Sequence, residues 1–126
     1  GDAKITGSKN HQLYEEYKKV TSRYVNQDLE LIKDSFYAKK ANDLKKLEQI
    51  EDKRNKTLVS KYLYTTNFAV NNAKYEVAPY VALAEIYDIN LKYLDTIQKS
   101  LSPKVAKSMY GKKLSELIQE RKAIEK

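Results

Sequence analysis

The chain has 126 residues and a formal net charge of +7 at pH 7, with 41% hydrophobic and 33% charged residues. This length fits one domain with a single core, and the even spread of charges excludes a membrane-spanning helix, which needs about 18 uncharged apolar residues in succession. Three glycines are too few for the turns of an all-β fold, and zero cysteines with one histidine exclude disulfides, thiolate metal sites and most zinc chemistry.

Residues 1–8 are predicted to form a strand remnant or a tail, because Ala3 and Ile5 alternate with polar neighbours. From Ser8 onward the spacing becomes helical, which predicts one long amphipathic helix with Ser8 or Asn10 as its N-cap. Two apolar stripes follow each other along this helix, the second shifted by one position: Leu13, Tyr17, Val20 and Tyr24, then Val25, Leu29, Ile32 and Phe36.

A second helical run spans about 38–67. Its predicted inner face carries Leu44, Leu47, Ile50, Leu58, Tyr62 and Thr65. The middle of this run, 51–56, is polar on every side, but no glycine or proline interrupts it, and we predict a continuous helix. The two runs together predict a long antiparallel helical hairpin over residues 9–68.

Asparagines between 67 and 75 predict a loop, and a short-helix half follows over residues 76–124. Its first helix, 76–87, tolerates Pro79 in the first turn and is expected to be central, because 77–86 carries a single charge. A helix over 90–101 follows, and Ser102-Pro103 predicts the start of a short helix that Gly111 separates from the last one. Residues 1–126 are thus expected to form a single all-α domain, a bundle of two long antiparallel helices and three or four shorter ones.

Side chains that could carry catalysis are sparse. His11 and Glu15 share a helical face, but a dinuclear carboxylate site needs a second histidine that the chain lacks. Paired carboxylates lie among lysines, as solvated surface residues do. We predict no catalytic residue, no metal site and no cofactor, and rank a helical metalloenzyme last among the functions considered.

The net charge of +7 and eleven tyrosines raise an alternative, a basic helical module that binds nucleic acid or an anionic surface. Only three residues are arginines, and the lysines are interleaved with acids throughout, with dense patches at 39–40, 45–46 and 112–113. Protein binding or self-association therefore ranks above nucleic-acid binding. The candidate interaction surface consists of Tyr75, Tyr80 and Tyr87.

Three motifs in the C-terminal half carry a family resemblance: NNAKYEVAPY at 71–80, LSPKV at 101–105 and SMYGKKL at 108–114. Together they resemble the helical part of a domain of unknown function that precedes the thioredoxin-like domain in cell-envelope thiol-disulfide oxidoreductases of Bacteroidetes-type bacteria. In that family an Asn-Pro-x-Ser loop leads into a Val-Ala helix. Here Asn72 or Ala73 replaces the proline, and Tyr75 replaces the serine.

The resemblance covers residues 3–122 and implies a non-catalytic accessory domain of the periplasm or cell envelope. Such a domain would act as a spacer, a dimerisation element or a partner-binding module, because the catalytic cysteines of the family have no counterpart here. It also implies that the parent gene begins with a signal or lipoprotein leader. After Lys126 we expect that gene to continue into a thioredoxin-like domain with a Cys-x-x-Cys motif.

Overall fold

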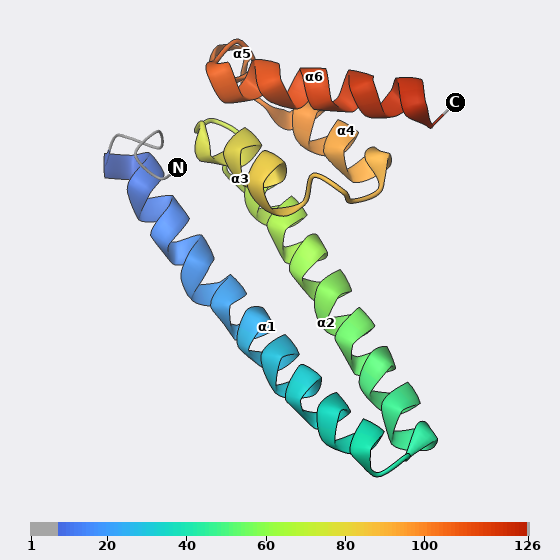
Figure 1. Ribbon diagram of the computed structural model, residues 1–126. Helices are drawn as coiled ribbons and strands as arrows, with labels where there is room; N and C mark the ends of the chain where they lie inside the picture. Colours follow the sequence, from blue (N-terminus) through green and yellow to red (C-terminus); the bar gives the residue numbers. More distant parts are fainter. Residues whose placement is uncertain (1–7, 126) are drawn as a thin grey trace. The chain divides into compact units, whose positions relative to one another are not determined.

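The computed structural model describes residues 8–125, and every regular element among them is a helix (Figure 1). These residues form six helices: α1 (Ser8–Lys40), α2 (Leu44–Asn71), α3 (Val77–Glu85), α4 (Leu91–Ser100), α5 (Pro103–Ala106) and α6 (Met109–Ile124). The predicted all-α class, with two long helices followed by shorter ones, is confirmed. The strand predicted for 1–8 lies outside the described residues except at Ser8, where α1 begins.

Two compact units divide the chain, and the boundary between them cuts both long helices. The hairpin unit is Lys18–Leu63. The short-helix unit combines the residues up to Tyr17 with Tyr64 and all that follows. The sequence had suggested a division after the second long helix. The ends of α1 and α2 that lie away from the turn between them, 8–17 and 64–71, instead pack into the same core as α3 to α6. We call these segments the outer ends of the two helices.

α3 is the central helix of the short-helix unit, as predicted. Its Val77, Ala78, Val81 and Ala82 are fully buried. α3 packs against α4 and α6, and α5 packs against α6. The neighbouring helices add Leu94, Ile97, Val105, Leu114 and Ile118 to this core. The small side chains of Ala78 and Ala82 allow the neighbouring helices to approach closely, and aliphatic residues fill the space around them.

An aromatic cluster joins the outer ends of α1 and α2 to α3 and α6 within this unit. Its rings belong to Tyr14, Tyr17, Tyr64, Phe68, Tyr80 and Tyr110. Tyr17 is fully buried, and its hydroxyl lies 2.9 Å from Thr65 Oγ1, a hydrogen bond in which either oxygen can donate. Burial raises the pKa of the Tyr17 phenol well above its ordinary value of 10.0. Packing of these rings thus fixes the ends of both long helices.

Side-chain caps start three of the shorter helices. Asn90 accepts from the Lys92 N–H, and Ser108 accepts from the Gly111 N–H. Ser102 caps α5 with Pro103 as its first residue, as the sequence predicted. Asn10, expected to cap its own helix, instead accepts a hydrogen bond from the Val77 N–H at 3.1 Å and so serves the first turn of α3.

Gly111 does not interrupt a helix. It lies in the first turn of α6, and a Cβ there would overlap the carbonyl oxygens of Val105 and Ala106. The predicted separation of a short helix from the last one is present, but it lies at 107–108 and not at Gly111, which allows close approach of α5 to α6 and keeps a helical backbone. Farther along α6, Arg121 donates to the carbonyl oxygens of Tyr87 and Ile89, which ties the α3–α4 connection to the last helix.

The turn between the long helices lies at 41–43, later than the sequence suggested. Asn42 adopts a left-handed backbone with φ of 55°. The N–H groups of Asn42 and Asp43 donate to the carbonyl oxygens of Lys39 and Ala38, which closes the C-terminus of α1 in a Schellman arrangement. Asp43 then accepts from the Lys46 N–H and starts α2. α2 runs unbroken through its polar middle, which confirms the predicted continuity.

Candidate interaction surface

The two long helices of the hairpin unit face each other along a seam with heptad spacing. On α1 the seam residues, all buried or half-buried, are Thr21, Tyr24, Asp28, Leu31, Ser35 and Ala38. On α2 they include the buried Ile50 and the half-buried Leu47, Thr57 and Lys61. Repeats of three and four residues are those that keep one side of a helix facing its neighbour. This seam contains about as many polar residues as apolar ones.

The more apolar stripe of α1 lies beside that seam on the surface. Leu29 and Phe36 are 58% and 62% exposed, and Val25 and Ile32 are exposed as well. On α2, Leu44 is 77% exposed and Leu58 is also exposed. The sequence had placed these side chains on inner faces, and that prediction was wrong for them. Because the stripe is shifted by one residue from the seam, it is rotated by about 100° away from α2.

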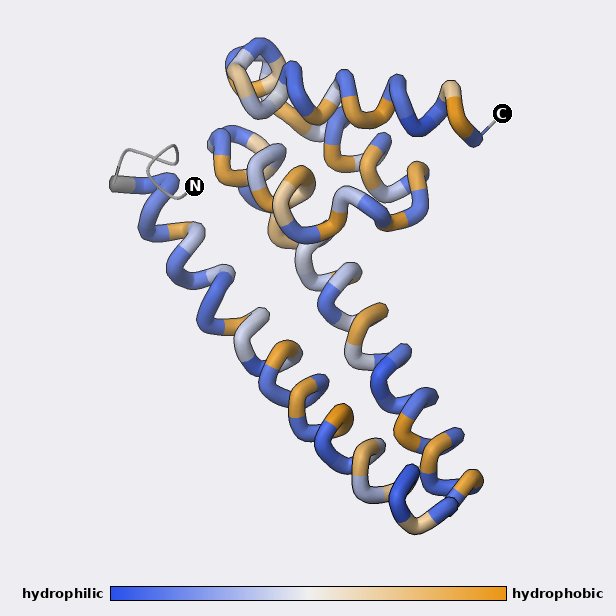
Figure 2. Tube along the Cα trace, in the orientation of Figure 1, coloured by the Kyte–Doolittle hydropathy of each residue, from blue (hydrophilic) through white to orange (hydrophobic). Residues whose placement is uncertain are grey.

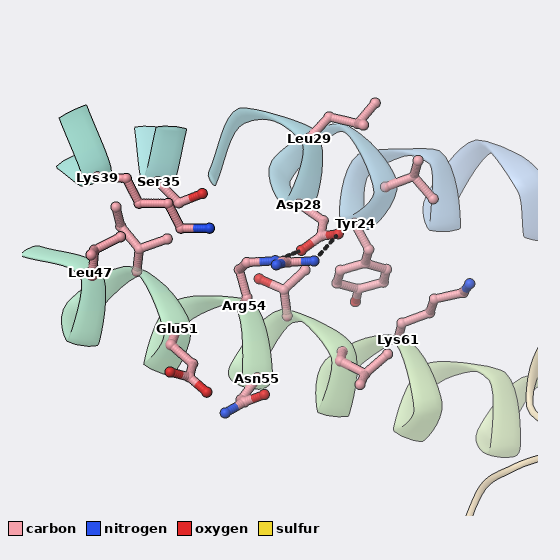
Figure 3. A pocket seen from close by; sticks show the side chains of 14 residues that line it. Tyr24, Asp28, Leu29, Ser35, Lys39, Leu47, Glu51, Arg54, Asn55 and Lys61 are labelled. Carbon is pink, nitrogen blue, oxygen red and sulfur yellow. Dashed lines mark hydrogen bonds and ion pairs between the residues drawn. The ribbon is translucent and has the colours of Figure 1, made fainter. Parts of the chain in front are cut away.

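A groove of about 650 Å³ lies between α1 and α2 of the hairpin unit (Figure 3). Its apolar lining includes Val25 and Leu29 from α1 and Leu47 and Leu58 from α2. Figure 2 shows hydrophobic residues recurring along both helices of this unit, separated by hydrophilic ones. The groove therefore opens on the side of the hairpin where the apolar stripes lie.

Helical spacing extends this apolar surface beyond the groove. Ile32 and Phe36 follow Leu29 by three and seven residues, and Leu44 precedes Leu47 by three, which places them on the same sides of their helices. We call the combined surface the open face. It consists of Val25, Leu29, Ile32 and Phe36 on α1 and Leu44, Leu47 and Leu58 on α2.

An ion pair lies inside the groove. Arg54 donates from Nε to Asp28 Oδ1 at 2.7 Å and from a terminal nitrogen to Oδ2 at 3.3 Å, which gives the two-pronged geometry that arginine favours (Figure 3). The hydrogen bond to Asp28 raises the pKa of the guanidinium. Both side chains remain partly exposed, so the pair contributes mainly to the register of α1 against α2 and little to stability.

The opposite side of the hairpin unit has a different character. A second hollow, of about 560 Å³, is lined mostly by polar and charged residues, with Leu31 the apolar exception: Asn26, Gln27, Glu30, Leu31, Lys53, Lys56 and Thr57. The open face and this second hollow thus differ in the types of residue that line them. An exposed apolar surface of this kind is typical of a protein-binding site.

The three tyrosines predicted as an interaction surface lie in different surroundings. Tyr80 is half-buried in the aromatic cluster, with its ring centroid 5.4 Å from that of Tyr14 and 5.1 Å from that of Tyr110. Tyr75 is half-buried, and the Lys9 ammonium lies 5.8 Å from the centre of its ring. Tyr87 is 56% exposed. Binding of a partner by these tyrosines stays a prediction, and Tyr87 offers most surface for it.

His11 and Glu15, weighed as metal ligands, come together at the surface. His11 Nε2 lies 4.0 Å from Glu15 Oε1, and both side chains are exposed. Among residues 8–125 no group of three or more histidine, cysteine or acidic side chains is placed to hold a metal ion. Within the same residues, no helix combines the length and apolar composition needed to cross a bilayer.

Comparison of the chain with protein-family models, with curated proteins and with solved structures found no match. The site is therefore characterised by its own structure alone: it is an exposed apolar surface on a helical hairpin. Sequence periodicity located the residues of that surface. It could not indicate that they lie outside the seam, because the period of a stripe does not identify its partner.

Proposed function

We propose that the chain is a non-catalytic protein-interaction module that binds its partner through the open face of the hairpin unit. The observation that carries this proposal is the exposure of one apolar stripe on α1, led by Leu29 and Phe36, beside the exposed Leu44 and Leu58 of α2. Monomeric proteins rarely leave apolar patches of more than a few hundred Å² uncovered.

The finer proposal is that this module is an accessory domain of a cell-envelope thiol-disulfide oxidoreductase, where it acts as a spacer, a dimerisation element or a partner-binding surface. Its support is the resemblance carried by 71–80, 101–105 and 108–114. Two of these segments hold helix starts that recur in the family pattern, at Ser102 and Ser108. The proposal includes a location in the periplasm or envelope and a thioredoxin-like domain in the parent chain.

Dithiothreitol-driven reduction of insulin tests the non-catalytic part. We expect the chain to leave the rate of insulin precipitation unchanged, because it has no thiol to exchange. A rate that rises in proportion to the amount of chain would contradict the proposal. The matched control is an unrelated protein without cysteine, at equal mass, which corrects for nonspecific effects on precipitation.

The sequence of the parent gene tests the envelope role. We expect a signal or lipoprotein leader upstream and a strand-helix-strand segment with Cys-x-x-Cys downstream. A gene without a cysteine pair would remove the support for the oxidoreductase connection, while the interaction module would stand on the open face alone.

One observation favours binding of an anionic surface as a second candidate. Four lysines, all exposed, flank the turn between α1 and α2: Lys39, Lys40, Lys45 and Lys46. Binding through them should weaken steeply with salt, because phosphate contacts release counterions. Electrophoretic mobility shifts with single- and double-stranded DNA at low salt test this candidate, and the absence of any shift would rule nucleic acid out.

A further inference from the structure

We propose that the partner of the open face is a second copy of this chain, and that two hairpin units pair face to face as an antiparallel four-helix bundle. This inference rests on the proposed interaction function and specifies its partner. A hairpin of two amphipathic helices is half of such a bundle, in which apolar side chains from four helices share one core. The open face supplies residues from both helices, as each half must.

The size of the open face fits this partner. Its six most exposed apolar residues together expose on the order of 600 Å² per copy, the upper end for the largest apolar patch on a typical monomer. Adding the polar residues at its edges brings the face to roughly the 800 Å² that each partner buries in a standard interface. Leu44 and Phe36, at 77% and 62% exposure, would lose the most contact with water.

The charges at the edges of the face also favour a second copy. On α1, Lys33 lies one turn from both Leu29 and Phe36, and the Lys40 ammonium lies 5.4 Å from the centre of the Phe36 ring. On α2, Glu48 lies one turn after Leu44, and Glu51 lines the groove together with Lys61 and with Arg54, which is paired with Asp28. At the edge of the open face, Lys33 and Lys40 on α1 and Glu48 on α2 thus carry opposite charges.

This charge pattern selects one of two symmetric arrangements. When α1 faces α2 of the second copy, lysines meet glutamates on both sides of the two-fold axis. When α1 faces α1, Lys33 and Lys40 meet lysines, which is unfavourable. In the first arrangement the axis runs along the helices, and the two turns lie at the same end.

The ion pair within each hairpin shows which positions of α1 and α2 lie at the same level along the helix axes. Asp28 and Arg54 lie level with each other. Counting along antiparallel helices from this pair, Lys33 lies level with position 49, one residue from Glu48. Rotation about a two-fold axis parallel to the helices leaves the position of each residue along that axis unchanged. Positions that are level within one copy are therefore also level between the two copies. Lys33 of one copy should therefore lie beside Glu48 of the other.

Sedimentation velocity of the full chain over a range of concentrations tests the pairing. We expect a reversible monomer–dimer equilibrium that Phe36→Glu weakens by about tenfold or more in Kd, as burial of a charge in an apolar interface does. Tyr37→Glu is the matched control. Tyr37 is 60% exposed against 62% for Phe36, but it lies about 100° around the helix, away from the open face.

Two results would overturn the proposal: a monomer at every concentration, or equal weakening by both variants. Circular dichroism melting of the two variants confirms that any loss of dimer comes from the surface and not from unfolding. A monomeric chain would leave the interaction module intact with a different partner. Insulin reduction and the parent gene test the proposed function independently of this result.

Disulfide trapping tests the arrangement, and the lack of natural cysteine makes it unambiguous. Lys33→Cys and Glu48→Cys chains, mixed in equal amounts and oxidised, should give mainly the mixed disulfide. Each variant oxidised alone serves as the control. Predominant Lys33→Cys homodimers would overturn the facing of α1 on α2, because they require α1 to face α1.

Discussion

Tyr17 is the residue on which the aromatic cluster depends most. Its ring packs against Tyr14, Tyr64 and Phe68, with the Phe68 centroid 5.0 Å away, and its hydroxyl bonds to Thr65. A buried hydroxyl needs such a partner, because leaving it unsatisfied costs about 1–3 kcal/mol. The bond therefore links the end of α2 to the start of α1 at one defined register.

The Tyr17 phenol makes stability depend on pH in a defined direction. Burial raises its pKa in the folded chain, so above about pH 10 the unfolded chain loses this proton while the folded chain keeps it. The stabilisation is complete below pH 10 and decreases as the pH rises. We expect the free energy of unfolding in urea to fall more steeply between pH 9 and 11 for the parent chain than for Tyr17→Phe.

Tyr17→Phe should also cost about 1 kcal/mol at pH 7, where the phenol is neutral in both states, because the hydrogen bond to Thr65 is lost. Tyr87→Phe is the control, since Tyr87 is exposed. Parallel pH profiles for the parent chain and Tyr17→Phe would show that the buried phenol does not control alkaline stability.

At the scale of elements, the turn at 41–43 shows how two residues end one helix and start the next. Asn42 takes the left-handed backbone that few residues other than glycine and asparagine tolerate, and Asp43 caps α2. Asp43→Ala should lower the free energy of unfolding of the hairpin unit by about 1 kcal/mol. Asp43→Asn should retain most of the stabilisation that the cap provides, because an asparagine side chain can accept the same hydrogen bond.

Thermal unfolding followed by circular dichroism, with amide exchange at 44–47 as the local readout, measures the effect of both variants. If Asp43→Ala exchanges at 44–47 as slowly as the parent chain, the cap contributes nothing.

The central position of α3 makes it sensitive to added volume. Ala82 is fully buried between neighbouring helices, and Ala82→Leu should overpack the core and cost roughly 1–3 kcal/mol. Ala84→Leu makes the same change at an exposed position of the same helix and should cost little. Urea unfolding compares the two variants. Equal stability of both would place α3 at the periphery of its unit.

Local signals in the sequence predicted where helices begin and continue better than they predicted which helices contact each other. Ser102-Pro103 and the uninterrupted run through 51–56 indicated a helix start and a continuous helix, because both depend on neighbouring residues alone. The cap that Asn10 gives to Val77 joins residues far apart in the chain and leaves no local pattern. Gly111 is close to Val105 in the chain, but its role depends on how closely α5 packs against α6, which no local pattern specifies.

The open face illustrates the same limit for the candidate site. Periodicity identified Val25, Leu29, Ile32 and Phe36 as one stripe, and the structure keeps them together. It could not distinguish a stripe that faces α2 from one that faces another molecule, because both obey the same spacing. The one-residue shift at Tyr24 and Val25 was the available signal that the stripe leaves the seam.

For the whole molecule, the two units differ in how they use apolar residues. The short-helix unit buries most of its large aliphatic side chains, with Met109 and Ile124 as exposed exceptions, whereas the hairpin unit exposes Leu29, Phe36 and Leu44 and places polar residues in its seam. A hairpin with a weak seam gains much of its stability from whatever covers its apolar side. We expect dimer formation and hairpin stability to rise together with the concentration of the chain.

The rate at which a maleimide labels a cysteine at position 29 tests the role of the open face most directly. In a chain without natural cysteine, Leu29→Cys reports on this face alone, and Tyr37→Cys, at nearly the same exposure, reports on the hairpin outside it. We expect Leu29→Cys to react rapidly in dilute solution and to slow as the concentration rises, while Tyr37→Cys reacts at a constant rate. Slow labelling of Leu29→Cys even at high dilution would contradict the exposed face, and a rate independent of concentration would contradict its covering by a second copy.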